Sequence, residues 1–70
     1  MLRFIDIIEN GKRLRVDEAA DGSAQIVDHP ELTVKRLGEH VIEVFRGDKS
    51  LGCFHDEDAV WIPQKCATGG

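Results

Sequence analysis

The sequence has few of the residues that mark the common functional classes of small proteins. It contains no tyrosine, one tryptophan and three phenylalanines among 70 residues. Surfaces for single-stranded nucleic acid usually combine exposed aromatic side chains with basic ones, whereas this chain has a formal net charge of −4. Nucleic-acid binding is therefore not expected. A nucleic-acid-binding small barrel stays an alternative, because five basic residues could share one side of a sheet: Lys12, Arg13, Arg15, Lys35 and Arg36.

Cysteine is also scarce. Cys53 and Cys66 allow a single disulfide, whereas small secreted domains usually carry two to four. We therefore expect free thiols. No apolar run approaches the roughly 20 residues of a membrane-spanning helix, and Asp6 comes too early for a secretory leader. The sequence thus predicts a cytoplasmic protein without a membrane partner.

The length allows one domain. A chain of this size buries only about 60% of the surface that its unfolded form exposes, so its core is thin. With 41% apolar and 31% charged residues, the composition is that of a globular protein. We expect a single small β domain over residues 1–63, with Phe45, Phe54 and Trp61 in its core. Residues 64–70 are small, polar and glycine-ended, and are expected to form a disordered tail.

The dipeptide Asn10-Gly11 predicts a hairpin between two β-prone runs, because both residues tolerate the positive φ of a type I′ turn. One face of the hairpin is then apolar and the other is largely charged. Counted from the turn, the predicted pairs are Glu9 with Lys12, Ile8 with Arg13, Ile7 with Leu14, Asp6 with Arg15 and Ile5 with Val16.

A second hairpin is predicted over residues 40–55, around the turn Gly47-Asp48. Both faces of its first arm are apolar, which is typical of a strand in the middle of a sheet. The predicted pairs are Arg46 with Lys49, Phe45 with Ser50, Val44 with Leu51, Ile42 with Cys53, Val41 with Phe54 and His40 with His55.

Residues 31–37 are ambiguous. Glu31, three residues after Asp28, and Gly38 as a stop are compatible with a short helix. We favour a strand that returns through Gly38-Glu39, because a two-turn helix is marginal. That strand would pair Leu32 with Phe45 and Val34 with Glu43, placing both on the face of Phe45 and Phe54.

Two further strands complete the predicted fold: one at residues 25–27, and one at residues 59–62 that Pro63 stops. The fold class is all-β, a small meander or partly open barrel of five to seven short strands. The structural alternative is an α+β fold with one short helix near residues 29–37.

The candidate metal ligands are His40, Cys53 and His55, with Asp56 or Cys66 as a further ligand. The predicted register puts the histidines opposite each other and Cys53 on their face. Zinc prefers such N and S donors. Zinc is the one cofactor that the sequence suggests, and the main hypothesis requires none.

For function, the sequence predicts a non-enzymatic protein–protein interaction module that self-associates, with a homodimer as its simplest form. It lacks a nucleophile with an oriented base, so enzymatic activity is not expected. An accessory or inhibitor protein, for instance of phage or mobile-element origin, fits its size alone. The alternative is a small metal- or ligand-binding domain that uses His40, Cys53 and His55.

Overall fold

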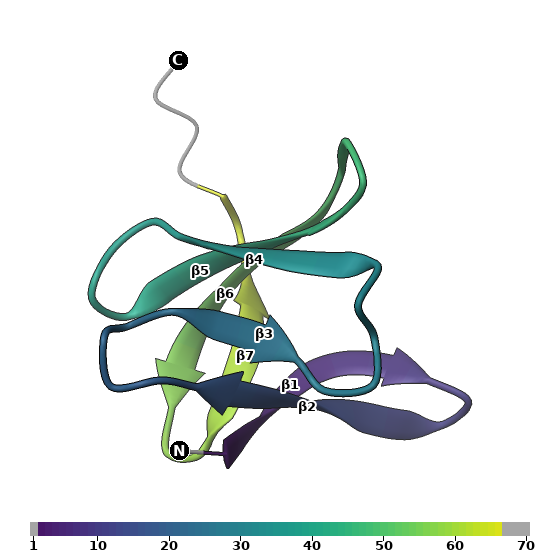
Figure 1. Ribbon diagram of the computed structural model, residues 1–70, viewed down its shortest axis with the longest axis horizontal. Coiled ribbons are helices and arrows are strands. Elements are labelled where there is room, and N and C mark those ends of the chain that lie inside the picture. The colour runs from purple at the N-terminus through teal and green to yellow at the C-terminus, as the bar shows by residue number, and fades with distance from the viewer. Residues whose placement is uncertain (1, 67–70) are drawn as a thin grey trace.

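The computed structural model describes residues 2–66, and every regular element in this range is a β-strand (Figure 1). The predicted all-β class is therefore confirmed. The strands are β1 (Leu2–Glu9), β2 (Lys12–Glu18), β3 (Ala24–Ile26), β4 (Leu32–Arg36), β5 (Val41–Arg46), β6 (Lys49–Glu57) and β7 (Val60–Gln64).

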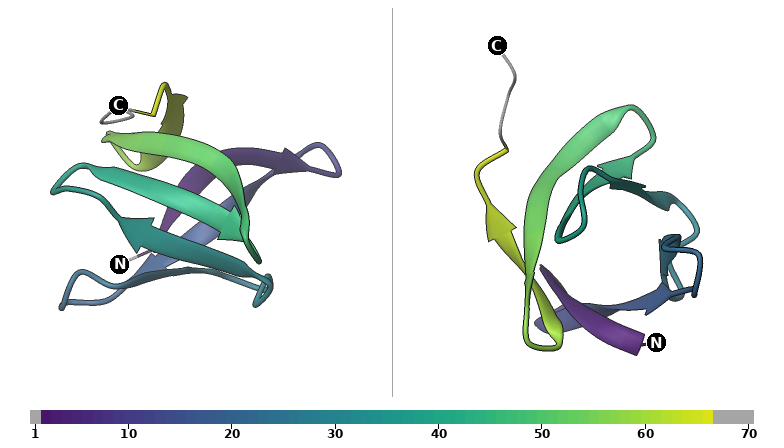
Figure 2. Two further views of the ribbon diagram at one scale, coloured as in Figure 1. Left: turned by 90° about the horizontal axis from the view of Figure 1, so that it is seen from above. Right: turned by 90° about the vertical axis from the view of Figure 1, so that its left-hand side faces the viewer.

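The seven strands form one sheet in the order β3-β2-β1-β7-β6-β5-β4. Two antiparallel meanders, β1–β3 and β4–β7, are joined by a short parallel ladder between β1 and β7. The sheet curls until β3 and β4 come into contact (Figure 2), without a ladder between them. The result is a nearly closed barrel with one unsealed seam, which confirms the predicted partly open barrel.

The core fills the inside of this barrel. Within residues 2–66 no polar or charged residue is buried, and Trp61, 1% exposed, is the largest buried side chain. Phe54 is in the core as predicted, whereas Phe45 lies on the outer face opposite Thr33 and is only partly covered. The core residues are Ile5, Leu14, Val16, Ile26, Leu32, Ile42, Val44, Phe54 and Trp61.

The first hairpin follows the prediction only near its turn. Asn10 and Gly11 both have positive φ, and Ile8 pairs with Arg13 as predicted. A bulge in β1 between Ile5 and Ile8 then shifts the register by two residues, so Ile5 pairs with Leu14 instead of Val16. The predictions for the far end of this hairpin were wrong. A shift of two keeps each side chain on its face, so the apolar face survived the error.

The second hairpin contains a bulge of one residue, which has the opposite consequence. Its pairs beside the turn are as predicted, but Val44 pairs with Gly52 and leaves Leu51 as the extra residue. Every later side chain of β6 therefore changes face. Phe54 pairs with Ile42 inside the barrel, and Cys53 moves outside.

Residues 32–36 form a strand and not a helix, as favoured. The turn that follows β4 uses four residues, 37–40, and not two. Val34 consequently pairs with Val44 and not Glu43, and Leu32 pairs with Arg46 and not Phe45. Leu32 thus belongs to the core with Ile42, not to a face with Phe45.

The last strand continues through Pro63, contrary to the prediction that Pro63 stops it. The lost N–H is tolerated because β1 pairs with β7 only at Val60 and Trp61, which leaves one edge of β7 free near Pro63. Gln64 belongs to β7 and Cys66 is bridged to Cys53, so the domain continues past residue 63. Residues 67–70 of the predicted tail lie outside the described residues. In the part of the chain that the structure covers, no helix is long and apolar enough to cross a membrane.

Candidate functional site

Each of the three residues predicted to bind metal, His40, Cys53 and His55, contacts a different partner. His55 pairs with Val41, so the predicted pairing of His40 with His55 was wrong. The Nδ1 atom of His40 lies 3.1 Å from an Asp56 carboxylate oxygen, and Nε2 of His55 lies 3.2 Å from a Glu57 oxygen. Cys53 shares the outer face of β6 with His55 but is bonded to Cys66. The expectation of free thiols was wrong.

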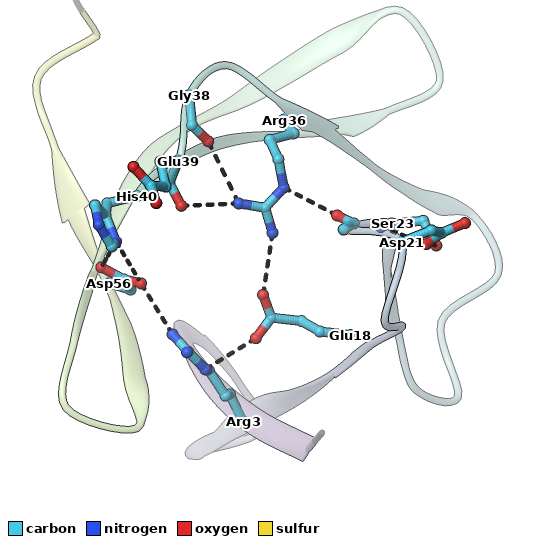
Figure 3. Close-up of polar contacts among 10 residues, drawn as sticks. Arg3, Glu18, Asp21, Ser23, Arg36, Gly38, Glu39, His40 and Asp56 are labelled. Atoms are coloured by element: carbon cyan, nitrogen blue, oxygen red, sulfur yellow. Dashed lines mark hydrogen bonds and ion pairs between the residues drawn. The ribbon is translucent and has the colours of Figure 1, made fainter.

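A cluster of charged side chains closes one end of the barrel (Figure 3). Arg3 bridges two carboxylates: its Nε is 2.9 Å from Glu18 and its Nη1 is 3.1 Å from Asp56. Arg36 reaches the same Glu18 at 3.2 Å, and His40 reaches Asp56. We call these five residues, Arg3, Glu18, Arg36, His40 and Asp56, the barrel-end cluster.

Strand alternation explains why these charges meet. Each residue of the barrel-end cluster lies two positions beyond an inward apolar residue of its own strand or turn, so its side chain follows the inward row past the last apolar position. Four of these apolar residues belong to the core, and Val34, the one next to Arg36, is partly buried against it. Arg3 precedes Ile5 in this way, and Asp56 follows Phe54. Sequence reasoning missed the cluster because this signal needs the correct register. The same spacing of two residues along the chain separates Glu18 from Val16, Arg36 from Val34 and His40 from Ile42.

The cluster rests on Trp61. The guanidinium carbons of Arg3 and Arg36 lie 5.6 Å and 6.0 Å from the centre of its ring. These are cation–π distances. Arg36 also donates hydrogen bonds to the carbonyl oxygens of Gly22, Gly38 and Glu39, which ties the loops of the barrel end together.

The charges shift the protonation of two members. The hydrogen bond and the negative charge of Asp56 raise the pKa of His40 above its ordinary value. Partial desolvation opposes ionisation of Asp56, but hydrogen bonds from His40 and Arg3 outweigh it and lower the pKa of Asp56. The pair is therefore held as carboxylate and, at mildly acidic pH, imidazolium.

The barrel-end cluster lacks the parts of a catalytic constellation. His40 and Asp56 have the geometry of a base and its orienting carboxylate. Among residues 2–66, however, no serine or cysteine hydrogen-bonds to His40, and Asp56 is shared with Arg3. The prediction that the protein is not an enzyme stays a prediction.

The basic residues proposed for nucleic acid do not share a face. Lys35 pairs with Glu43 on the outside of the barrel, whereas Arg36 points to Glu18 at its end. Arg13 lies 3.0 Å from Asp6, and Arg15 lies 3.7 Å from Asp28. The basic surface that this alternative requires is broken up by acidic partners.

The outer face of β1 carries the clearest unexplained feature of the surface. Leu2, Phe4 and Ile8 are 54%, 43% and 62% exposed. On β7, Val60 pairs with Phe4, so it lies on the same face, and Ile62 follows two residues later. We call Leu2, Phe4, Ile8, Val60 and Ile62 the apolar strip.

Comparison with known proteins gives no match: no family model fits the sequence, and no curated protein or solved structure is significantly similar to it. Function is therefore argued from the apolar strip and the side-chain clusters alone.

Proposed function

We propose that this protein is a small, non-enzymatic interaction module that self-associates through the apolar strip. The supporting observation is the exposure of Leu2, Phe4 and Ile8 on one face of one strand. Single exposed apolar residues are ordinary, but several on one face of a strand, with charges around them, are characteristic of a protein–protein contact.

The rim favours a second copy of the same chain as the occupant. On β2, Asp17 pairs with Leu2 and Arg13 pairs with Ile8, so the strip has an acidic end and an end that carries the ion pair of Arg13 with Asp6. In a two-fold interface each patch meets its own copy in reverse. An axis near Phe4 would bring Arg13 of one copy to Asp17 of the other. Asp17 makes no ion pair with residues 2–66, which leaves it free for this contact.

The size of the strip sets the strength of the dimer. Fully burying a Leu, Ile or Phe side chain stabilises by about 1.5–3 kcal/mol. Leu2, Phe4 and Ile8 are about half exposed, so six such side chains in a dimer contribute roughly 5–9 kcal/mol. Association costs about 4–15 kcal/mol. We therefore expect a weak dimer that dissociates on dilution.

Sedimentation velocity over a concentration series tests the proposal. The wild type should shift from monomer to dimer, and Phe4→Ser or Ile8→Ser should abolish the shift. Leu37→Ser is the matched control, because Leu37 is 47% exposed but lies on the β4–β5 turn away from the strip. This variant should dimerise like the wild type.

A charge exchange tests the assignment of the occupant. Asp17→Lys should weaken the dimer by placing like charges together. Adding Arg13→Asp should restore it in a variant that also carries Asp6→Asn, which avoids two carboxylates side by side at that end. A wild type that stays monomeric at the highest soluble concentration overturns self-association, and a different protein would then be the occupant of the strip.

The cytoplasmic location stays a prediction, and the disulfide counts against it. Disulfides persist in oxidising compartments and are rare in the cytosol. The Cys53–Cys66 bridge therefore favours an oxidising location. Thiol trapping of the protein in its native cell would decide between the two: alkylation of both cysteines without prior reduction would support the cytoplasm.

A further inference from the structure

Three side chains that can bind a metal ion meet on the outer face of β5 and β6. A carboxylate oxygen of Glu43 and the sulfur atoms of Cys53 and Cys66 all lie within 4.8 Å of one another. In the structure the two cysteines form a disulfide. We propose that, once this disulfide is reduced, Glu43, Cys53 and Cys66 bind a zinc ion, with water as the fourth ligand.

The fold itself assembles these residues. The bulge at Leu51 turns Cys53 outward, where it pairs with Glu43 on one side and Gln64 on the other. Cys66 comes two residues after Gln64 and reaches back to Cys53, with 5.2 Å between their Cα atoms. The cluster thus joins β5, β6 and the segment that follows β7.

The carboxylate of Glu43 is oriented by a hydrogen bond, and no basic side chain among residues 2–66 forms an ion pair with it. The hydroxyl of Ser50 donates a 2.6 Å hydrogen bond to its Oε2 atom, which orients the carboxylate. Lys35 lies opposite Glu43 on β4, yet residues 2–66 provide Glu43 with no ion pair. A half-buried carboxylate beside two sulfur atoms is therefore left without a positive partner.

The chemistry of the donors selects zinc. Thiolates prefer Zn²⁺ over Ca²⁺ or Mg²⁺, and three protein ligands with one water form a common zinc geometry. Ligands of one tetrahedral zinc ion lie about 3.5–4 Å apart, so the cluster needs side-chain movements of only about 1–2 Å. Cys53 is 2% exposed, whereas Cys66 is half-buried and offers the sulfur that a reductant can reach.

The redox step balances with a dithiol as the reductant. Its two thiols transfer two electrons and two protons to the Cys53–Cys66 bond and become a disulfide themselves. Zinc then displaces the proton from each cysteine thiol and binds the two thiolates. A small-molecule disulfide reverses the step: it accepts two electrons from the two thiolates and, with two protons from water, becomes two thiols, while the Cys53–Cys66 bond re-forms and the zinc ion is released. The site would thus bind zinc only under reducing conditions.

Zinc titration of the protein with and without a phosphine reductant, which adds no competing thiol, tests the proposal. The reduced wild type should bind one zinc ion in competition with a chromogenic chelator, and the oxidised wild type should not. With Co²⁺ as a probe, the reduced protein should show thiolate-to-metal charge-transfer absorption. Glu43→Gln should weaken zinc binding by about tenfold or more, since even groups that only orient a ligand contribute about 10- to 100-fold.

Glu31→Gln is the matched control, because Glu31 is an exposed carboxylate that contacts His29, 3.0 Å away, and is not one of the three clustered residues. Its zinc affinity should equal that of the wild type. Reduction could unfold the protein, so the fluorescence of Trp61 is recorded in each titration. Zinc binding with a solvent-exposed Trp61 signal, equal binding by Glu43→Gln, or no binding by the reduced wild type would each overturn the proposal. None of these outcomes affects self-association, which is measured on the oxidised protein.

Discussion

Replacing Glu18 by Gln should destabilise the barrel by about 2–3 kcal/mol. Its side chain is 12% exposed and binds both Arg3 and Arg36. Losing an exposed ion pair costs about 1 kcal/mol at most, whereas removing one partner of a buried pair costs about 3–5 kcal/mol. Glu18→Gln falls between these limits, because Arg3 keeps Asp56 as a partner while Arg36 keeps only carbonyl oxygens.

The assay is equilibrium unfolding in urea, followed by the fluorescence of Trp61, the sole tryptophan of the chain. In thermal unfolding of a domain of this size, the same loss of free energy lowers the melting temperature by roughly 10–20 °C. Asp6→Asn is the control, because Asp6 pairs with Arg13 at a more exposed position, with side chains 29% and 53% exposed. It should cost less than about 1 kcal/mol. If Glu18→Gln costs no more than Asp6→Asn, the barrel-end cluster does not stabilise the fold.

Four further outcomes are expected. Ile42→Asp should prevent folding, because Ile42 is 0% exposed and an unpaired buried charge costs several kcal/mol; a variant with a wild-type melting temperature would contradict the register. The raised pKa of His40 contributes stability that is complete below pH about 6.5 and is lost as pH rises through the raised value, so His40→Gln should remove this part of the pH profile of unfolding. The lowered pKa of Asp56 acts in the opposite direction, with stability present above pH about 4 and lost as pH falls through the lowered value. Reducing the Cys53–Cys66 bridge, which spans 13 residues, should cost about 3 kcal/mol by chain entropy, measured as the change in the urea midpoint.

Local patterns in the sequence were enough to predict the strands and the two tight hairpin turns. Asn10-Gly11 and Gly47-Asp48 dictate tight hairpins because Asn10, Gly11 and Gly47 tolerate positive φ, and the pairs next to both turns were predicted correctly. Alternation of apolar residues then gave an all-β fold. These signals are local because the backbone conformation of a turn depends on its own residues.

The two bulges and the four-residue turn at residues 37–40 could not be predicted from these patterns, because no local sequence signal marks an extra residue. Leu51 fits a regular strand as well as a bulge, and only packing of Phe54 into the core decides between them. The disulfide was missed for a different reason: free thiols were expected because two cysteines allow only one bridge, fewer than small secreted domains usually carry. The barrel-end cluster needs the same correct register before its inward charges can be recognised.

One extra residue in β6 therefore has two consequences, one for the apolar core and one for the polar outer face. Because the face of every following side chain is reversed, the bulge at Leu51 supplies Phe54 to the core and places Cys53 outside, next to Glu43 and Cys66. Without the bulge, Cys53 would be a small buried apolar residue and Phe54 a large exposed one. The core thus gains the side chain of Phe54 by the same shift that brings two sulfur atoms and a carboxylate together on the outer face of the sheet. The candidate zinc site and the stability of the barrel consequently depend on one feature of the backbone.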